Sequence, residues 1–250
     1  MLLALAAPLG LIIGSFLNVV AYRLPRGESI VKPRSRCTTC GTEVRALDNI
    51  PLVSWLVLRG RCRHCEAQIS ARYPVVELAT GVVFGLVALA RGPHLELLID
   101  LPFAAMLIAV ADIDLEHRIV PNRILAPMAV WTVAATAVIR PGKLPECLIA
   151  GAAAFTLLLL AALAYPGGMG MGDVKLAGVM GLCLGAPVAP ALLVAFFTGS
   201  VMGVAIMLRH GAAARKRAVP FGPFLALGGL VALVAGQELI HLYAHRFLGS

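Results

Sequence analysis

Two acidic residues in mostly apolar surroundings are the feature of this sequence that first suggests chemistry. Asp114 ends a long apolar run, and Asp173 follows much later in the tetrapeptide Gly170-Met171-Gly172-Asp173. Ionisable side chains in or beside membrane-spanning segments are costly, so their positions are informative. Two carboxylates that meet cannot both ionise easily, and one keeps a proton while the other is charged. Such a pair activates a water and polarises a carbonyl, which is the chemistry of an aspartic protease.

The residues around the two carboxylates favour this hypothesis but leave an alternative open. Gly170 and Gly172 remove side chains where an extended substrate backbone would approach Asp173. Asp112 and Asp114 point about 200° apart on a continuous helix, so only one of them can face Asp173. We expect this partner to be Asp114, which is nearer the end of the apolar run and therefore nearer to water. Alternatively, the acidic residues lie simply in interfacial water at helix ends, and a G-x-G-D motif alone does not exclude this.

Four cysteines form a second chemical cluster. They occur as two C-x-x-C knuckles with 21 residues between them, and the four are Cys37, Cys40, Cys62 and Cys65. Four thiolates with this spacing can close a tetrahedral shell around zinc. Two disulfides or a redox C-x-x-C are the alternatives, which a cytoplasmic position and two matched knuckles disfavour. Because four thiolates leave no open coordination position for water, we expect this zinc to be structural. The remaining thiols, Cys147 and Cys183, lie in apolar segments and are interpreted as packing residues.

The elements that position these residues require a membrane. Of the 250 residues 60% are hydrophobic and 14% are charged, with a mean hydropathy of +0.89. This is too apolar for a water-soluble domain. Several apolar runs approach the length that crosses a hydrocarbon core of about 30 Å. We predict an all-α polytopic membrane protein with about eight transmembrane helices, at residues 2–22, 74–90, 96–113, 121–139, 147–165, 174–186, 188–208 and 221–243. The runs at 74–90, 96–113 and 174–186 are short or interrupted and also fit tilted or partly re-entrant segments.

The basic residues orient these spans. With the N-terminus outside, 17 of the 21 Lys and Arg fall on the inner side, and only Arg91, Arg140, Lys143 and Arg246 fall outside. This is the distribution that the positive-inside rule requires. The net charge of +8 therefore reflects topology, and we expect the lipid bilayer as a partner but no nucleic acid. Both Asp114 and Asp173 then lie at the cytoplasmic border of their spans.

The topology also divides the chain into domains. We predict a first transmembrane helix at 1–22, a cytoplasmic four-cysteine zinc domain at 23–73 and a transmembrane catalytic domain at 74–250. The first run lacks a basic region before it, so we expect a retained helix and not a cleaved signal peptide. The insert at 23–73 is too small for a large core of its own, and zinc would supply the missing stability.

Several blocks, in order along most of the chain, resemble the prepilin peptidase family, also called type IV leader peptidases. The blocks are residues 14–20 with Arg23-Leu24-Pro25, 49–56 with 59–62, 69–77, Ile113-Asp114 with Val120-Pro121-Asn122, and Gly170-Met171-Gly172-Asp173. The chain departs from the family at one point, because Asn122 stands where some relatives have Asp. An amide at that position cannot serve as an additional acid. Asn18 and Glu77 also fall in these blocks, where hydrogen bonding between helices and substrate contact are both open interpretations.

The resemblance implies a membrane aspartic endopeptidase with Asp114 and Asp173 as its catalytic pair. Its substrates would be type IV prepilins or pseudopilins, which lose a short basic leader after a glycine at the cytoplasmic face of the bacterial inner membrane. Many members with the four-cysteine insert also methylate the new N-terminus with S-adenosylmethionine, so the resemblance extends to this second activity. The sequence shows no nucleotide-binding fingerprint for that second activity.

Two alternatives from other classes remain at this stage. A polytopic ion or solute transporter with intramembrane aspartates predicts charges spread across the membrane depth and a repeat relating two halves of the chain. The acidic pair is instead clustered at one face, and the sequence shows no repeat. A zinc-stabilised membrane scaffold without chemistry would leave the glycines before Asp173 unexplained.

Overall fold

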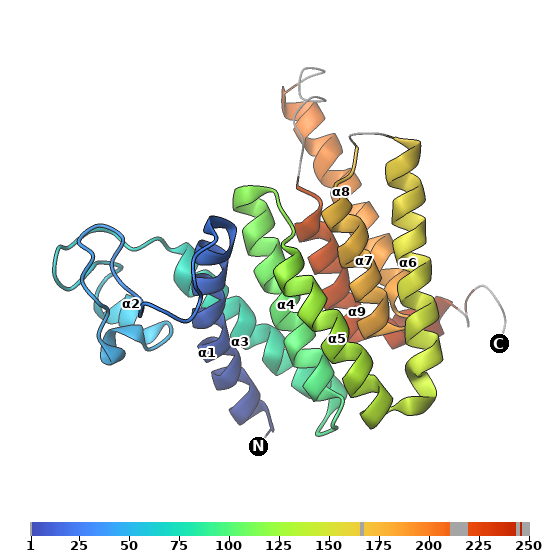
Figure 1. Cartoon of the computed structure of the whole chain (residues 1–250), viewed down its shortest axis with the longest axis horizontal. Coiled ribbons are helices and arrows are strands. Elements are labelled where there is room, and N and C mark those ends of the chain that lie inside the picture. Colours follow the sequence, from blue (N-terminus) through green and yellow to red (C-terminus); the bar gives the residue numbers. More distant parts are fainter. Residues whose placement is uncertain (1, 166–167, 211–219, 244–245, 247–250) are drawn as a thin grey trace. The chain divides into compact units, whose positions relative to one another are not determined.

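The structure is a computed structural model that describes residues 2–165, 168–210, 220–243 and 246. These residues form helices joined by turns and loops, with two isolated β-bridges and no sheet (Figure 1). Eight long helices carry the fold. They are α1 (Leu2–Arg23), α3 (Arg72–Arg91), α4 (Leu97–His117), α5 (Asn122–Ile139), α6 (Leu144–Ala164), α7 (Met171–Leu184), α8 (Val188–His210) and α9 (Gly222–Tyr243). Each of the eight predicted spans coincides with one of these helices, so the all-α prediction is confirmed.

Six of the eight helices are long and apolar enough to cross a membrane, and these six are α1, α3, α5, α6, α8 and α9. The other two fall short for different reasons. Helix α4 has 21 residues but carries Asp100, Asp112, Asp114 and Glu116. Helix α7 has only 14 residues, a length of about 21 Å at 1.5 Å per residue. The two helices that are least typical of membrane spans are therefore the two that carry the predicted catalytic pair.

The chain folds into two compact units, Met1–Pro93 and His94–Ser250. In the first unit α1 packs along α3 at very short range. A Cβ atom on Gly14 would lie 2.7 Å from the Cα atom of Glu77, and one on Gly10 would lie 2.6 Å from the carbonyl oxygen of Thr80. Only glycine permits this approach, as in other small-residue contacts between membrane helices. Helix α3, which we placed in the catalytic domain, thus folds together with α1 and the insert.

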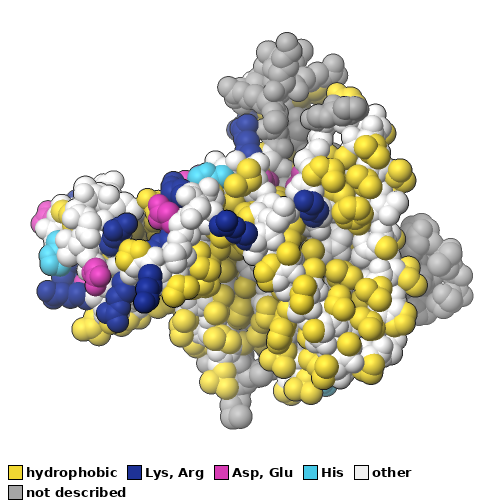
Figure 2. All heavy atoms as spheres, in the orientation of Figure 1, with side chains coloured by type: hydrophobic (Ala, Val, Ile, Leu, Met, Phe, Trp, Pro, Cys, Tyr) yellow, Lys and Arg dark blue, Asp and Glu magenta, His cyan; other side chains and the backbone are white. Residues whose placement is uncertain are grey.

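The insert between α1 and α3 contains two short 3-10 helices, η1 (Leu24–Arg26) and η2 (Ala46–Asn49), and one short α-helix, α2 (Val53–Val57). Its first loop is organised by Arg23, whose buried guanidinium donates hydrogen bonds of 3.0 and 2.8 Å to the carbonyl oxygens of Ser29 and Pro33. Figure 2 shows Lys and Arg side chains gathered over the insert. The polar part of the first unit is therefore tied to the last residue of α1.

In the second unit, α7 is the central helix. It contacts α4, α5, α6, α8 and α9, and ten of its 14 residues are buried. A Cβ atom on Gly181 would lie 2.5 Å from the carbonyl oxygen of Ala150 on α6, so these two helices also approach closely. The short 3-10 helix η3 (Pro141–Lys143) connects α5 to α6. This packing fixes the first turn of α7, where Asp173 lies.

Candidate active site and metal centre

Asp114 lies in the last turn of α4 and is buried. The backbone N–H of Gly222, the first residue of α9, donates a hydrogen bond of 3.0 Å to its Oδ2 atom. A Cβ atom on Gly222 would lie only 2.7 Å from that oxygen, so no other residue fits without displacing the carboxylate. The N-terminus of a helix carries partial positive charge and favours an anion at this position.

Gly222 is a site residue that sequence reasoning missed. In the sequence Phe221-Gly222-Pro223 the proline marks only the start of a helix. Nothing in that motif indicates a carboxylate more than 100 positions earlier in the chain, because the contact arises from the packing of α4 against α9.

Asp173 lies in the first turn of α7 and is also buried. Its backbone N–H donates a hydrogen bond of 3.1 Å to the carbonyl oxygen of Gly170. A Cβ atom on Gly170 would lie 3.5 Å from the Oδ2 atom of Asp173, which is ordinary van der Waals contact. Helices α4 and α7 contact each other, and Gly172, next to Asp173, packs against Val120, six residues after Asp114. The structure thus places the two predicted carboxylates at neighbouring helix ends within one unit.

The second glycine of the motif has a packing role in this structure. A Cβ atom on Gly172 would lie 2.8 Å from the Cβ atom of Val120, in the segment between α4 and α5. Close by, the Nζ atom of Lys175 donates a hydrogen bond of 3.2 Å to the Oδ1 atom of Asn122. Both contacts hold the first turn of α7 against the chain that follows Asp114. The amide at position 122 therefore binds a lysine, which an aspartate would bind as an ion pair.

Asp112 is buried on α4 as well. The positive charge of Arg118, which ends α4 in a left-handed conformation, acts on Asp114. Two polar residues in the first unit have structural partners. Asn18 donates a hydrogen bond of 3.1 Å to the carbonyl oxygen of Tyr73, and Glu77 accepts one of 2.8 Å from the backbone N–H of Leu52. The contact of Asn18 joins α1 to α3, as the helix-packing interpretation expects, whereas that of Glu77 joins α3 to the insert.

The four cysteines of the insert converge as their spacing predicted. Their Sγ atoms all lie within 4.8 Å of one another. Tetrahedral zinc with Zn–S bonds of about 2.3 Å places its sulfur ligands about 3.8 Å apart. The Sγ atoms of Cys37 and Cys65 are 3.8 Å apart. The donor set and its geometry therefore fit a structural four-thiolate zinc site.

The two knuckles are copies of one backbone turn. In the first, the N–H of Cys37 donates to the carbonyl oxygen of Thr42 over 2.9 Å. In the second, the N–H of Cys62 donates to the carbonyl oxygen of Ala67, also over 2.9 Å. The residue after the second cysteine of each knuckle has positive φ, 71° at Gly41 and 55° at Glu66. The repeated turn aims four sulfur atoms at one point.

The thiols differ in how readily they lose a proton. Hydrogen bonds from the side chain and backbone of Thr42 lower the pKa of Cys40 to about 6. The backbone amide of Cys65 lowers the pKa of Cys62. The pKa of Cys65 is raised to about 12, because desolvation and its thiol neighbours outweigh the amide of Ala67. Thiolate is the form that binds zinc, so metal binding would release the protons that remain.

The other two cysteines are buried in the second unit, as expected for packing residues. The Sγ atom of Cys183 lies 3.1 Å from the Oγ1 atom of Thr132.

Comparison with known proteins identifies related sequences over nearly the whole chain. Residues 9–91 match the bacterial peptidase A24 N-terminal domain, and residues 101–208 match the type IV leader peptidase family. Relatives named prepilin leader peptidase/N-methyltransferase include one from Aeromonas hydrophila that is 34% identical over 268 residues, covering 95% of this chain and 92% of the relative. One from Bacillus subtilis is 34% identical over 241 residues, covering 96% and 97%. One from Neisseria gonorrhoeae is 35% identical over 268 residues, covering 94% and 91%.

No solved structure gives a significant match to the chain. The two matched regions are separated at residues 92–100, where the chain also divides into its two compact units.

Proposed function

Because the chain belongs to the type IV leader peptidase family, we propose that it removes the leader from type IV prepilins or pseudopilins with Asp114 and Asp173 as its catalytic pair. The predicted enzyme class, prepilin leader peptidase, is confirmed by the relatives. Their names and the clustering of the two carboxylates both argue against the transporter alternative.

One observation carries the assignment of the pair. Asp114 and Asp173 are buried in the last turn of α4 and the first turn of α7, two helices of one unit that contact each other. A scaffold without chemistry has no need to keep two carboxylates together in an apolar fold, where each is costly. Their proximity therefore supports catalysis.

The contacts of the two residues suggest their roles. Asp114 accepts a hydrogen bond from Gly222 at the start of a helix, which favours a charged carboxylate. We assign it the role of the base that takes a proton from the attacking water. Asp173 would hold the shared proton, polarise the scissile carbonyl and give that proton to the leaving amine. After cleavage the proton taken from water is on Asp114, and its transfer to Asp173 restores the starting state.

Two finer statements belong to the same proposal. We place the pair at the cytoplasmic face of the bacterial inner membrane, because the positive-inside rule puts 17 of the 21 Lys and Arg on that side. We also propose N-methylation of the new N-terminus, which the names of the relatives include, with S-adenosylmethionine supplying the methyl group. The described residues contain no strand, and hence no glycine-rich turn between a strand and a helix, so no residues are assigned to this donor.

The mass of the N-terminal peptide of a coexpressed prepilin tests the proposal, since it reports leader removal and methylation together. The unaltered protein should yield the shortened peptide carrying one added methyl group. Asp173→Asn should leave the leader attached while the protein is still inserted in the membrane, because an amide can neither activate water nor share the proton. Normal leader removal by this variant would contradict the assignment.

A further inference from the structure

Residues 49–58 form a segment of the insert that differs from its surroundings. The sequence Asn-Ile-Pro-Leu-Val-Ser-Trp-Leu-Val-Leu contains no charged residue, although residues 23–73 as a whole carry ten Lys and Arg and four acidic residues. Five large apolar side chains on and just before this segment are exposed. They are Leu47 at 78%, Ile50 at 44%, Val53 at 53%, Leu56 at 67% and Val57 at 71%. A contiguous apolar surface of this kind marks a binding or membrane-contacting face.

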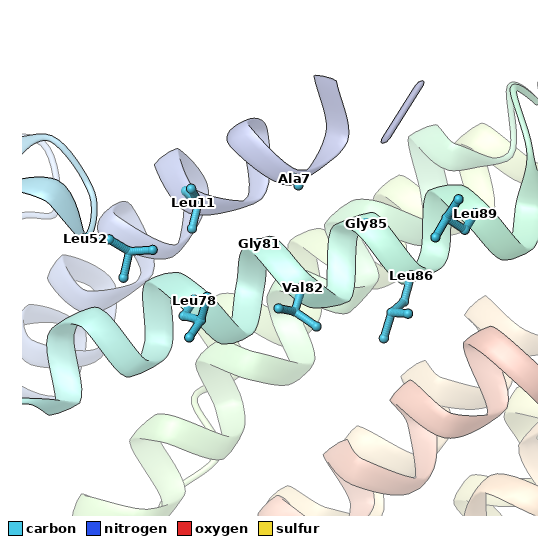
Figure 3. A pocket seen from close by; sticks show the side chains of 9 residues that line it. All are labelled: Ala7, Leu11, Leu52, Leu78, Gly81, Val82, Gly85, Leu86 and Leu89. Atoms are coloured by element: carbon cyan, nitrogen blue, oxygen red, sulfur yellow. The ribbon is translucent and has the colours of Figure 1, made fainter. Parts of the chain in front are cut away.

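We propose that this segment, residues 49–58 with helix α2 in its second half, is an interfacial anchor that inserts its apolar side chains into the lipid leaflet beside α1 and α3. The first line of support is depth. Leu52 lines an apolar groove of about 260 Å³ together with Leu11 of α1 and Leu78 of α3 (Figure 3). Both helices are candidate membrane spans. The anchor segment therefore lies against spans and not beyond their ends.

The depth can be expressed along the helix axes. Glu77 and Leu78 lie about 8 to 9 Å inside the start of α3 at Arg72, given 1.5 Å per residue. On the other side of the segment, Pro51 lines a cavity of about 510 Å³ with Ile12 and Phe16 of α1. Interfacial helices bury their apolar face about 5–10 Å into the boundary between headgroups and acyl chains. The hydrogen bond between Leu52 and Glu77 places the centre of the segment in that range.

Buried hydrogen bonds fix the segment at this depth. The Oε2 atom of Glu77, itself buried in α3, accepts the backbone N–H of Leu52 over 2.8 Å. Leu52 adopts φ of 60° and ψ of −50°, a conformation that a leucine seldom occupies unless its surroundings impose it. The imposed conformation and the buried acceptor show that the position of the segment is specified by the fold.

The backbone of the segment also meets the condition for entering lipid, where polar groups need internal partners. The Oγ atom of Ser54 accepts the N–H of Ile50 over 2.9 Å and donates to the carbonyl oxygen of Leu47 over 2.9 Å. The N–H groups of Leu56 and Leu58 are bonded within the α2 turn at 3.0 and 2.9 Å. These four internal bonds lower the cost of placing the segment in lipid.

The basic residues beside the apolar segment favour lipid as its binding partner. The apolar segment is flanked by Arg45 on one side and by Arg59 and Arg61 on the other, all of them exposed. Basic residues beside a shallow apolar surface are attracted to the anionic lipids of the cytoplasmic leaflet. This proposal rests on the proposed cytoplasmic placement of the insert and is independent of the catalytic pair.

The chain contains two tryptophans, Trp55 in α2 and Trp131 in α5, so Trp131→Phe leaves Trp55 as the single fluorophore. We would reconstitute this full-length variant in nanodiscs whose phospholipids carry bromine at shallow or deep acyl positions. An interfacial Trp55 should lose about half of its emission to shallow bromine, less to deep bromine and little to aqueous acrylamide. Emission that bromine leaves unchanged would overturn the proposal. Quenching by acrylamide would then show a face in water, and protection from acrylamide would show a face covered by protein.

Two further variants make the test specific. Val57→Asp, added to Trp131→Phe, should weaken quenching by bromine and increase quenching by acrylamide. Gln68→Asp, at an exposed position on the second knuckle, is the matched control and should change neither. Zinc content verifies that both variants keep the fold of the insert. Adding Asp173→Asn instead should leave the quenching intact, which separates this proposal from the fate of the catalytic assignment. Equal effects of Val57→Asp and Gln68→Asp would contradict the anchor.

Discussion

Gly222 donates its backbone N–H to the Oδ2 atom of Asp114 across 3.0 Å. The contact joins the first residue of α9 to the last turn of α4. A Cβ atom on Gly222 would come within 2.7 Å of the same oxygen. The hydrogen bond can therefore form only if residue 222 has no side chain. The position of a proposed catalytic carboxylate thus depends on a glycine in another helix.

Replacing this glycine should impair catalysis. We expect Gly222→Ala to lower the rate of leader cleavage at least about tenfold, because the added methyl group displaces a carboxylate whose hydrogen bond contributes roughly 1.5–3 kcal/mol. Gly142→Ala is the matched control, since a Cβ atom there would meet nothing within 4 Å. Cleavage rates at equal expression provide the measurement, and equal rates for the two variants would show that Asp114 does not need this contact.

The two neighbouring aspartates of α4 should differ in importance. We expect Asp114→Asn to reduce cleavage by about 100-fold or more, as for the loss of a general base, and Asp112→Asn to keep substantial activity. The reason is helical phase, since the two side chains point about 200° apart and the charge that acts on Asp173 is that of Asp114. Turnover of a prepilin by both variants, at matched expression, measures the difference. The reverse order of activity would mean that the pair is Asp112 and Asp173.

Zinc should be stoichiometric and structural. We expect about one zinc per chain, lost when Cys37 and Cys40 are both replaced by serine, with the insert becoming sensitive to proteolysis because the metal supplies its folding energy. Elemental analysis and limited digestion are the measurements. Cys147→Ser, at a buried position far from the cluster in sequence, is the control and should keep its zinc. A carefully purified, unaltered protein without zinc would refute the metal site.

The crossing of α1 and α3 should tolerate no side chain at its closest point. We expect Gly14→Val to destabilise the first unit by about 1–3 kcal/mol, the usual effect of overpacking. A Cβ atom at Gly14 would lie 2.7 Å from the Cα atom of Glu77, whereas one at Gly203 on α8 would meet nothing within 4 Å. Thermal unfolding of Gly14→Val and Gly203→Val in the same detergent compares the two positions. A similar loss of stability in both would mean that the close crossing is unimportant.

The long helices and the cysteine cluster were predictable from sequence for simple reasons. A membrane helix can be predicted from the length of its apolar run. Two C-x-x-C knuckles at this spacing predict four thiols around one metal ion. The contact of Gly222 with Asp114 and that of Glu77 with Leu52 were not predictable. Each joins residues whose proximity depends on how helices pack, and no local pattern encodes that. The packing of Gly172 against Val120 belongs to the same class, since the motif suggested room for substrate at that glycine.

Helix α7 is about 21 Å long, whereas a hydrocarbon core is about 30 Å thick. At its C-terminal end, side chains bind the backbone. Arg140 donates a hydrogen bond of 3.1 Å to the carbonyl oxygen of Cys183, and Glu146 accepts one of 2.9 Å from the N–H of Ala186. A helix this short leaves either Asp173 or its other end below the lipid surface. The thickness of the bilayer around this unit should then affect the rate of cleavage, because a thinner bilayer brings water nearer to the two carboxylates. We therefore expect the cleavage rate to depend on acyl chain length, with the enzyme itself unchanged.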